Sequence, residues 1–186
     1  MKKELLLRLI ILFLINLSCY SQHSERFNKL IENVNPSDSI IEIKKYKNGK
    51  TKSVNRFYEY EYGDYIYTFS YGTNQIFNKK GILVYEIKYV NFGNFILEKQ
   101  FSDDGEIVLV SESEFIDTSA ESLEKFFKSH KHLTYTISQK SYGTIFETNE
   151  TYIAQEGRRK NGKKIGIWKT YNCEGLVKEK EYSERK

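Results

Sequence analysis

The chain has 186 residues, among them 15 Tyr and 12 Phe but only one Pro and 11 Gly. This composition excludes a low-complexity or disordered chain and favours β-strands, in which aromatic side chains are enriched. The formal net charge of +4 is too small for the concentrated basic surface of a nucleic-acid-binding protein, so we expect no nucleic acid among its partners.

Residues 1–21 have the features of a secretory signal peptide. Lys2 and Lys3 form a charged start, and residues 9–17 form an apolar core that is shorter than the roughly 20 residues needed to span a bilayer. We expect cleavage after residue 21 and an exported protein, periplasmic or extracellular, that meets the membrane only transiently. A lipid on Cys19 is the less favoured alternative, because the residues before it partly resemble a lipobox.

Residues 22–36 are expected to form an N-terminal helix and a linker. Ser24 can cap the helix, and Pro36 ends it because the residue before a proline is pushed out of the α region. The apolar residues recur at helical spacing on one stripe, namely Phe27, Leu30, Ile31 and Val34. A single apolar stripe predicts that this helix docks on another part of the protein.

Residues 37–186 are expected to form one β-rich domain, and its most distinctive segment is a tyrosine-rich hairpin. Aromatic residues alternate on both sides of Gly63-Asp64, which predicts two strands joined by a two-residue turn. The rings would share one face; the tyrosines are Tyr58, Tyr60, Tyr62, Tyr65, Tyr67 and Tyr71. The favoured interpretation is a sheet stiffened by cross-strand aromatic pairs, and the alternative is a ring platform for sugars or a peptide.

Turn signals recur along the chain at a spacing typical of short structural repeats. Gly49, Gly81 and Gly105 each follow an aromatic residue by a few positions and precede another strand-like segment. The acidic residues of 103–106 lack the further ligands of a calcium loop and are explained as a β-turn. A further turn is expected at 141–143. These features predict a degenerate array of hairpins.

A second helix is expected at about 118–131, inserted between strands. Thr118 and Glu121 have the spacing of a capping box. An apolar stripe follows, formed by Leu123, Phe126 and Phe127. We expect this helix to cover a sheet face, and a partner-binding helix is the alternative.

The segment from Gly157 to Tyr182 contains the strongest hairpin signal. Asn161-Gly162 suits a type I′ turn, because both central positions of that turn need positive φ. Basic residues concentrate around it: Arg158, Arg159, Lys160, Lys163 and Lys164. This basic tip is expected to be a solvated loop or, alternatively, a contact for an acidic partner or an anionic envelope lipid.

This segment resembles the bacterial variant of the MORN repeat, an antitoxin-like repeat. The resemblance is carried by Asn161-Gly162-Lys163, Gly166-Ile167-Trp168, Tyr171, Gly175 and Tyr182. It implies a mainly β fold, an antiparallel meander of stacked hairpin repeats that serves as an interaction scaffold. With the two helices added, the expected architecture is that meander with an N-terminal helix and one inserted helix.

Side chains that could carry catalysis are sparse. His130 and His132 have no nearby Cys or His to complete a metal site, and acidic Glu174 next to Cys173 is the wrong neighbour for a reactive thiol. We therefore expect no catalytic residue, no metal ion and no cofactor.

The sequence predicts an exported, non-enzymatic binding or scaffold protein of the bacterial envelope, whose partner is a protein or an envelope component. The candidate binding residues are the six tyrosines of the hairpin together with Arg158, Arg159, Lys160 and Trp168. Two alternatives stay open. One is a carbohydrate-binding or carbohydrate-active protein that uses the tyrosine face, and the other is an exported immunity or antitoxin-like protein.

Overall fold

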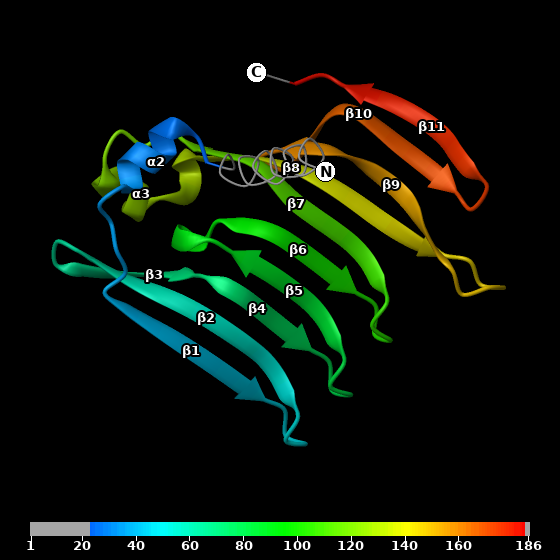
Figure 1. Ribbon diagram of the computed structural model, residues 1–186, viewed down its shortest axis with the longest axis horizontal. Helices are drawn as coiled ribbons and strands as arrows, with labels where there is room; N and C mark the ends of the chain where they lie inside the picture. Colours follow the sequence, from blue (N-terminus) through cyan, green and yellow to red (C-terminus); the bar gives the residue numbers. More distant parts are fainter. Residues whose placement is uncertain (1–22, 185–186) are drawn as a thin grey trace, which may run out of the picture.

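The computed structural model describes residues 23–184, so the predicted signal peptide and Cys19 lie outside the described residues. One open, antiparallel sheet dominates the fold, and its strands follow one another in the order β1-β2-β4-β5-β6-β7-β8-β9-β10-β11, with β3 paired to β2 (Figure 1). The strands are β1 (Asp38–Lys45), β2 (Thr51–Tyr62), β3 (Tyr65–Ser70), β4 (Gly72–Phe77), β5 (Leu83–Tyr89), β6 (Phe95–Phe101), β7 (Ile107–Thr118), β8 (Leu133–Thr144), β9 (Thr151–Lys160), β10 (Lys163–Asn172) and β11 (Gly175–Tyr182). The predicted antiparallel meander is confirmed.

Strands β3 and β4 follow one another along the same side of β2. The second half of β2 pairs with β3 up to Tyr62 opposite Tyr65, which confirms the two-residue turn at Gly63-Asp64. The first half pairs with β4. Gly72, at φ +60°, begins β4 after the break, and the Asn74 side chain accepts a hydrogen bond from the Arg56 backbone N–H at 2.8 Å. The side chain thereby replaces a ladder bond that the break removes.

The predicted recurrence of turns is present as a stack of loops at one end of the sheet. Gly49, Gly81 and Gly105 occupy equivalent positions with φ between +83° and +91°, a conformation that glycine adopts without strain. Neighbouring loops are hydrogen-bonded to one another. Asn48 Nδ2 donates to the Lys79 carbonyl at 3.0 Å, and Asn78 Nδ2 donates to the Asp103 carbonyl at 2.9 Å. The 103–106 acidic segment belongs to one of these turns.

The prediction of a turn at 141–143 is wrong. These residues continue β8, and the chain reverses instead between Thr144 and Thr151. Gly143 lies opposite Tyr152, and a Cβ at Gly143 would come within 2.8 Å of the Tyr152 ring. The glycine therefore makes room for an aromatic ring on the neighbouring strand, a role that local sequence cannot distinguish from a turn.

The hydrophobic core lies at one end of the sheet, where the helices pack against the ends of β2, β3 and β7 (Figure 1). The helical elements are α2 (Glu25–Ile31), the 3-10 turn η1 (Asn91–Gly93), α3 (Leu123–Lys128) and the 3-10 turn η2 (His130–His132). The buried core side chains are Phe27, Tyr60, Phe69, Phe92, Ile116, Ala120, Phe126 and Phe127. Both predicted helices exist, and their apolar residues pack into this core, but α2 ends at Ile31 rather than at Pro36, so Val34 packs from the segment after the helix.

The inserted helix is shorter than predicted and has a different cap. Ser122 accepts the capping hydrogen bond from the Lys125 backbone N–H, and α3 begins only at Leu123. Thr118 is instead the last residue of β7, opposite Leu133, and its hydroxyl accepts from the Ala120 N–H. Strand pairing thus takes the residue that the capping-box pattern assigned to the helix.

A row of alternating charges crosses the sheet away from the core. It crosses four adjacent strands through Lys140, Glu156, Lys169 and Glu179. Oppositely charged cross-strand neighbours are compatible with a flat solvated surface, whereas like charges would repel. The sequence can therefore build a single-layer sheet whose uncovered face remains in water.

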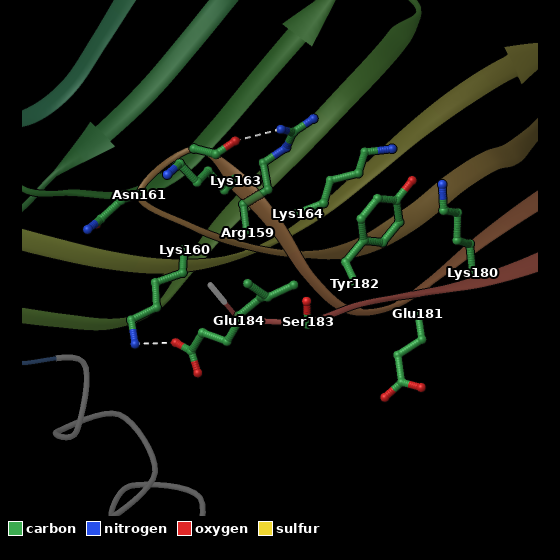
Figure 2. Close-up of a pocket in the computed structure, with 12 residues that line it drawn as sticks. Arg159, Lys160, Asn161, Lys163, Lys164, Lys180, Glu181, Tyr182, Ser183 and Glu184 are labelled. Carbon is green, nitrogen blue, oxygen red and sulfur yellow. Dashed lines mark hydrogen bonds and ion pairs between the residues drawn. The ribbon is translucent and has the colours of Figure 1, made fainter. Parts of the chain in front are cut away.

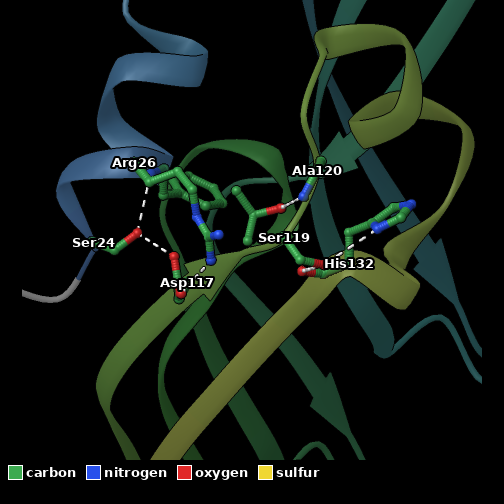
Figure 3. Close-up of polar contacts among 8 residues, drawn as sticks. Ser24, Arg26, Asp117, Ser119, Ala120 and His132 are labelled. Atoms are coloured by element: carbon green, nitrogen blue, oxygen red, sulfur yellow. Dashed lines mark hydrogen bonds and ion pairs between the residues drawn. The ribbon is translucent and has the colours of Figure 1, made fainter.

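Helix α2 is held on the sheet by a polar contact as well as by Phe27 (Figure 3). Ser24 caps the helix, accepting from the Phe27 N–H at 3.0 Å, and its hydroxyl also donates to the Asp117 carboxylate. Arg26 Nη2 lies 2.6 Å from the other Asp117 oxygen. Burial raises the pKa of Asp117, but the hydrogen bonds from Ser24 and Arg26 outweigh it and hold that pKa below its usual value.

Replacing Asp117 by asparagine should lower the free energy of unfolding at pH 7 by about 1–2 kcal/mol, because hydrogen bonds to a charged group are lost. A carboxylate whose pKa is lowered by folding stabilises the protein above its unfolded pKa, near 4, and loses that contribution as pH falls through the folded pKa. Urea unfolding should therefore show a smaller difference in the free energy of unfolding between the two proteins at pH 3 than at pH 7. Asp103→Asn, in an exposed turn, is the control. A pH-independent difference for Asp117→Asn would contradict the account.

Candidate functional site

The tyrosine hairpin contributes mainly to the core. Tyr60 is fully buried, with its ring 4.5 Å from that of Phe92. Tyr58 stacks on Tyr71 with ring centroids 3.7 Å apart. Burial raises the pKa of Tyr60 to about 12, as expected for a phenol removed from water. The structure therefore shows the shared aromatic face that was predicted, but packs its centre against other aromatic rings.

The exposed part of this hairpin is its tip. Tyr65 is 65% exposed, and Tyr62 is 36% exposed. Tyr67 is half-buried against Phe127 of α3, with ring centroids 4.8 Å apart. Of the six candidate tyrosines, the two at the turn present the most ring surface to a partner.

The basic residues that adjoin one another in sequence point to different faces of the sheet. Arg158 forms an ion pair with Glu114 of β7 at 2.5 Å. Arg159, on the opposite face, donates from Nε to the Gln139 side chain at 2.9 Å and from Nη1 to the Gly162 carbonyl at 2.7 Å. Arg158 is thus separated from Arg159, and it does not line the groove that the other cations of the predicted basic tip surround.

Trp168 is a structural residue in this region. Its indole is 3% exposed and covers Gly157, where a Cβ would come within 2.4 Å of the ring. The indole N–H donates to the Arg158 carbonyl at 2.9 Å. Lys164 Nζ lies 3.9 Å from the ring centroid, a cation–π contact. With these contacts the ring has little surface left on which a sugar could stack.

A groove of about 1120 Å³ lies beside this indole, between the β9–β10 turn and β11 (Figure 2). Asn161 and Gly162, at φ +47° and +79°, form the predicted tight turn at one end of the groove. The charged lining residues are Arg159, Lys160, Lys163, Lys164, Lys180, Glu181 and Glu184. Tyr182 lies among them, with Lys180 Nζ 5.0 Å from its ring centroid.

The groove carries an excess of positive charge. Five cations line it against two carboxylates, and Glu184 is already ion-paired with Lys160. Arg159 and Lys164 are oriented by hydrogen bonds to Gln139 and Gln155. Lys163 and Lys180 have no such bond among the contacts of the described residues. Their ammonium groups are available to an anionic ligand.

No protein-family model matches the chain, and no curated protein and no solved structure was found to match it. The likeness of 157–182 to a MORN repeat variant therefore stays an interpretation of its residues. Among the described residues, no helix is long and apolar enough to cross a membrane.

Sequence reasoning identified the cations on either side of the turn but missed Lys180, Tyr182 and Glu184. Lys180 and Tyr182 come from the next strand, where Gly166 lies opposite Tyr182 and Trp168 opposite Lys180, and Glu184 follows the end of that strand. The signal that could have found them is the alternation of charge in β11, once its register against β10 is known. Cys173, which was judged unreactive, is exposed in the β10–β11 turn at the opposite end of these strands.

Proposed function

We propose that this protein is an exported, non-enzymatic binding or scaffold module of the bacterial envelope, and that it binds an acidic segment of a partner protein in the basic groove. The observation that carries the proposal is the charge of the groove, with five cations gathered from β9, β10 and β11. The resemblance of this segment to interaction repeats supports the same assignment.

An extended acidic peptide suits the shape and chemistry of this groove. The groove is open to solvent, and its free ammonium groups come from Lys163 of β10 and Lys180 of β11. The lysine ammonium group is a compact charge on a flexible side chain, so it can bind carboxylates that approach at varied angles. Tyr182 adds a ring with a hydroxyl beside them, a combination common in protein interfaces.

A glycan platform receives less support. Tyr60 is buried, Tyr58 is stacked on Tyr71, and Trp168 is covered by Gly157 and Lys164. Sugar recognition by stacking needs a free ring face, which these central residues do not offer. A protein partner therefore fits the exposed groups of the groove better.

Replacing both Lys163 and Lys180 by glutamate should weaken binding of a fluorescein-labelled oligoglutamate peptide by at least roughly tenfold, about 1.4 kcal/mol. Two attractive contacts become repulsive, and fluorescence anisotropy at low salt measures the change. Raising the salt concentration should weaken binding to the unaltered protein, because exposed charges are screened over about 10 Å at 0.1 M.

The matched control replaces Lys47 and Lys79, which lie in loops at the opposite end of the strands, by glutamate. It changes the net charge by the same amount and should leave peptide binding within about twofold. Equal losses in both double variants would show that net charge alone attracts the peptide and would contradict the groove proposal.

A further inference from the structure

Strand β1 is an open edge with an apolar surface. It pairs with β2 on one side only, and no strand of residues 23–184 pairs with its other side. Ile40, Ile41 and Ile43 are 40%, 59% and 58% exposed. Edge strands normally carry prolines, bulges or inward charges that block pairing with another chain. The segment from Asp38 to Lys44 has no proline, and its register with β2 is continuous.

The opposite edge, β11, is protected against pairing with a copy of itself. A two-fold axis perpendicular to a sheet keeps each side chain on its own face, so an antiparallel self-pair places even-numbered residues opposite even ones. In β11 the even positions 178 and 180 are Lys, and the odd positions 179 and 181 are Glu. Every symmetric register near its centre therefore opposes like charges, which is destabilising.

The same rule has the opposite result for β1. With Ile41 opposite Ile41 of a second copy, Asp38 lies opposite Lys44, and this pair occurs twice because of the symmetry. Ile43 then lies opposite Ser39 on the face of the central isoleucine pair. Glu42 lies opposite Ile40 and keeps its own partner, since Lys44 Nζ is 3.0 Å from it within the strand.

We propose that the protein forms a symmetric dimer by antiparallel pairing of β1 with β1 of a second copy, in the register with Ile41 on the two-fold axis. The two sheets become one continuous sheet, the unpaired backbone groups of β1 find partners, and the exposed isoleucines are shielded from water. The basic groove lies at the far edge of each sheet, so the dimer presents two grooves at its outer ends.

Charge exchange tests the register. Sedimentation equilibrium of the exported protein should show a species of twice its own chain mass. Asp38→Lys and Lys44→Asp should each weaken dimerisation by about tenfold or more, because each places like charges opposite one another. The double variant restores opposite charges and should recover dimerisation to within about threefold of the unaltered protein. If both single variants weaken dimerisation and the double variant does not restore it, the proposed register is wrong.

A second pair of variants tests the edge itself. Ile41→Lys sets two lysines against each other on the axis and should give a monomer, while Val177→Lys on the β11 edge should leave the dimer intact. Emission from Trp168, which lies far from β1, verifies that each variant is folded. A monomeric unaltered protein, a dimer that survives Ile41→Lys, or polymers that grow with concentration through β1 and β11 would each overturn the proposal.

Discussion

Replacing Gly157 by alanine is expected to destabilise the protein by about 3–5 kcal/mol, the cost of losing a buried tryptophan. The new Cβ would lie 2.4–2.6 Å from three atoms of the Trp168 indole, so the ring must leave its position. The indole then loses its hydrogen bond to the Arg158 carbonyl. Trp168 is the only tryptophan of the chain, so a red shift of its emission reports the displacement directly. Urea unfolding measures the loss of stability.

A double-mutant cycle with Trp168→Ala separates the clash from other effects of the glycine. Trp168→Ala by itself should cost a similar 3–5 kcal/mol. Once the indole is absent, Gly157→Ala has no ring to displace and should cost less than about 1 kcal/mol further, as followed by circular dichroism. Costs that simply add would contradict the contact as the origin of the effect.

Replacing Phe127 by alanine should also cost about 3–5 kcal/mol, because it removes a buried ring from the centre of the core. Phe127 joins α3 to the tyrosine hairpin and to η1, with ring centroids 4.8 Å from Tyr67, 5.9 Å from Phe69 and 6.2 Å from Phe92. The cavity cannot be filled by one neighbour, since the surrounding rings are held on two different elements, β3 and η1. Urea unfolding should show the midpoint falling sharply.

Phe146→Ala is the matched control, because this phenylalanine lies in the β8–β9 loop and is 97% exposed. The same chemical change there should alter the free energy of unfolding by no more than about 0.5 kcal/mol. Similar losses in both variants would show that burial in the core does not account for the effect of Phe127→Ala.

Local chemistry explains why several elements were predictable. Asn161-Gly162 and Gly63-Asp64 turn the chain as expected, and Ser24 caps α2, because each depends on residues next to one another. Most strands then pair with the strand that comes next in the sequence, so the sheet needs few contacts between segments that are far apart in the chain. The fold class could be predicted for this reason.

Competition between distant segments explains the errors. Thr118 matches a capping box but ends β7, because Leu133 pairs with it from across the inserted helix. Gly143 matches a turn but stays in β8, because Tyr152 occupies the space above it. In both positions a residue of the next strand decided between two locally acceptable conformations.

The sequence by itself determined the glycine turns other than the reversal between β8 and β9, the alternation of the strands, both apolar helix stripes and the basic character of the last hairpins. Only the tertiary structure decided which of those side chains are accessible. Tyr60 is removed from the surface because α3 and η1 converge on it, and Arg158 is separated from Arg159 by the pleat of β9. The groove exists because the register of β11 sets Lys180 and Tyr182 beside the cations of β10, and register depends on packing between strands rather than on the composition of any one of them.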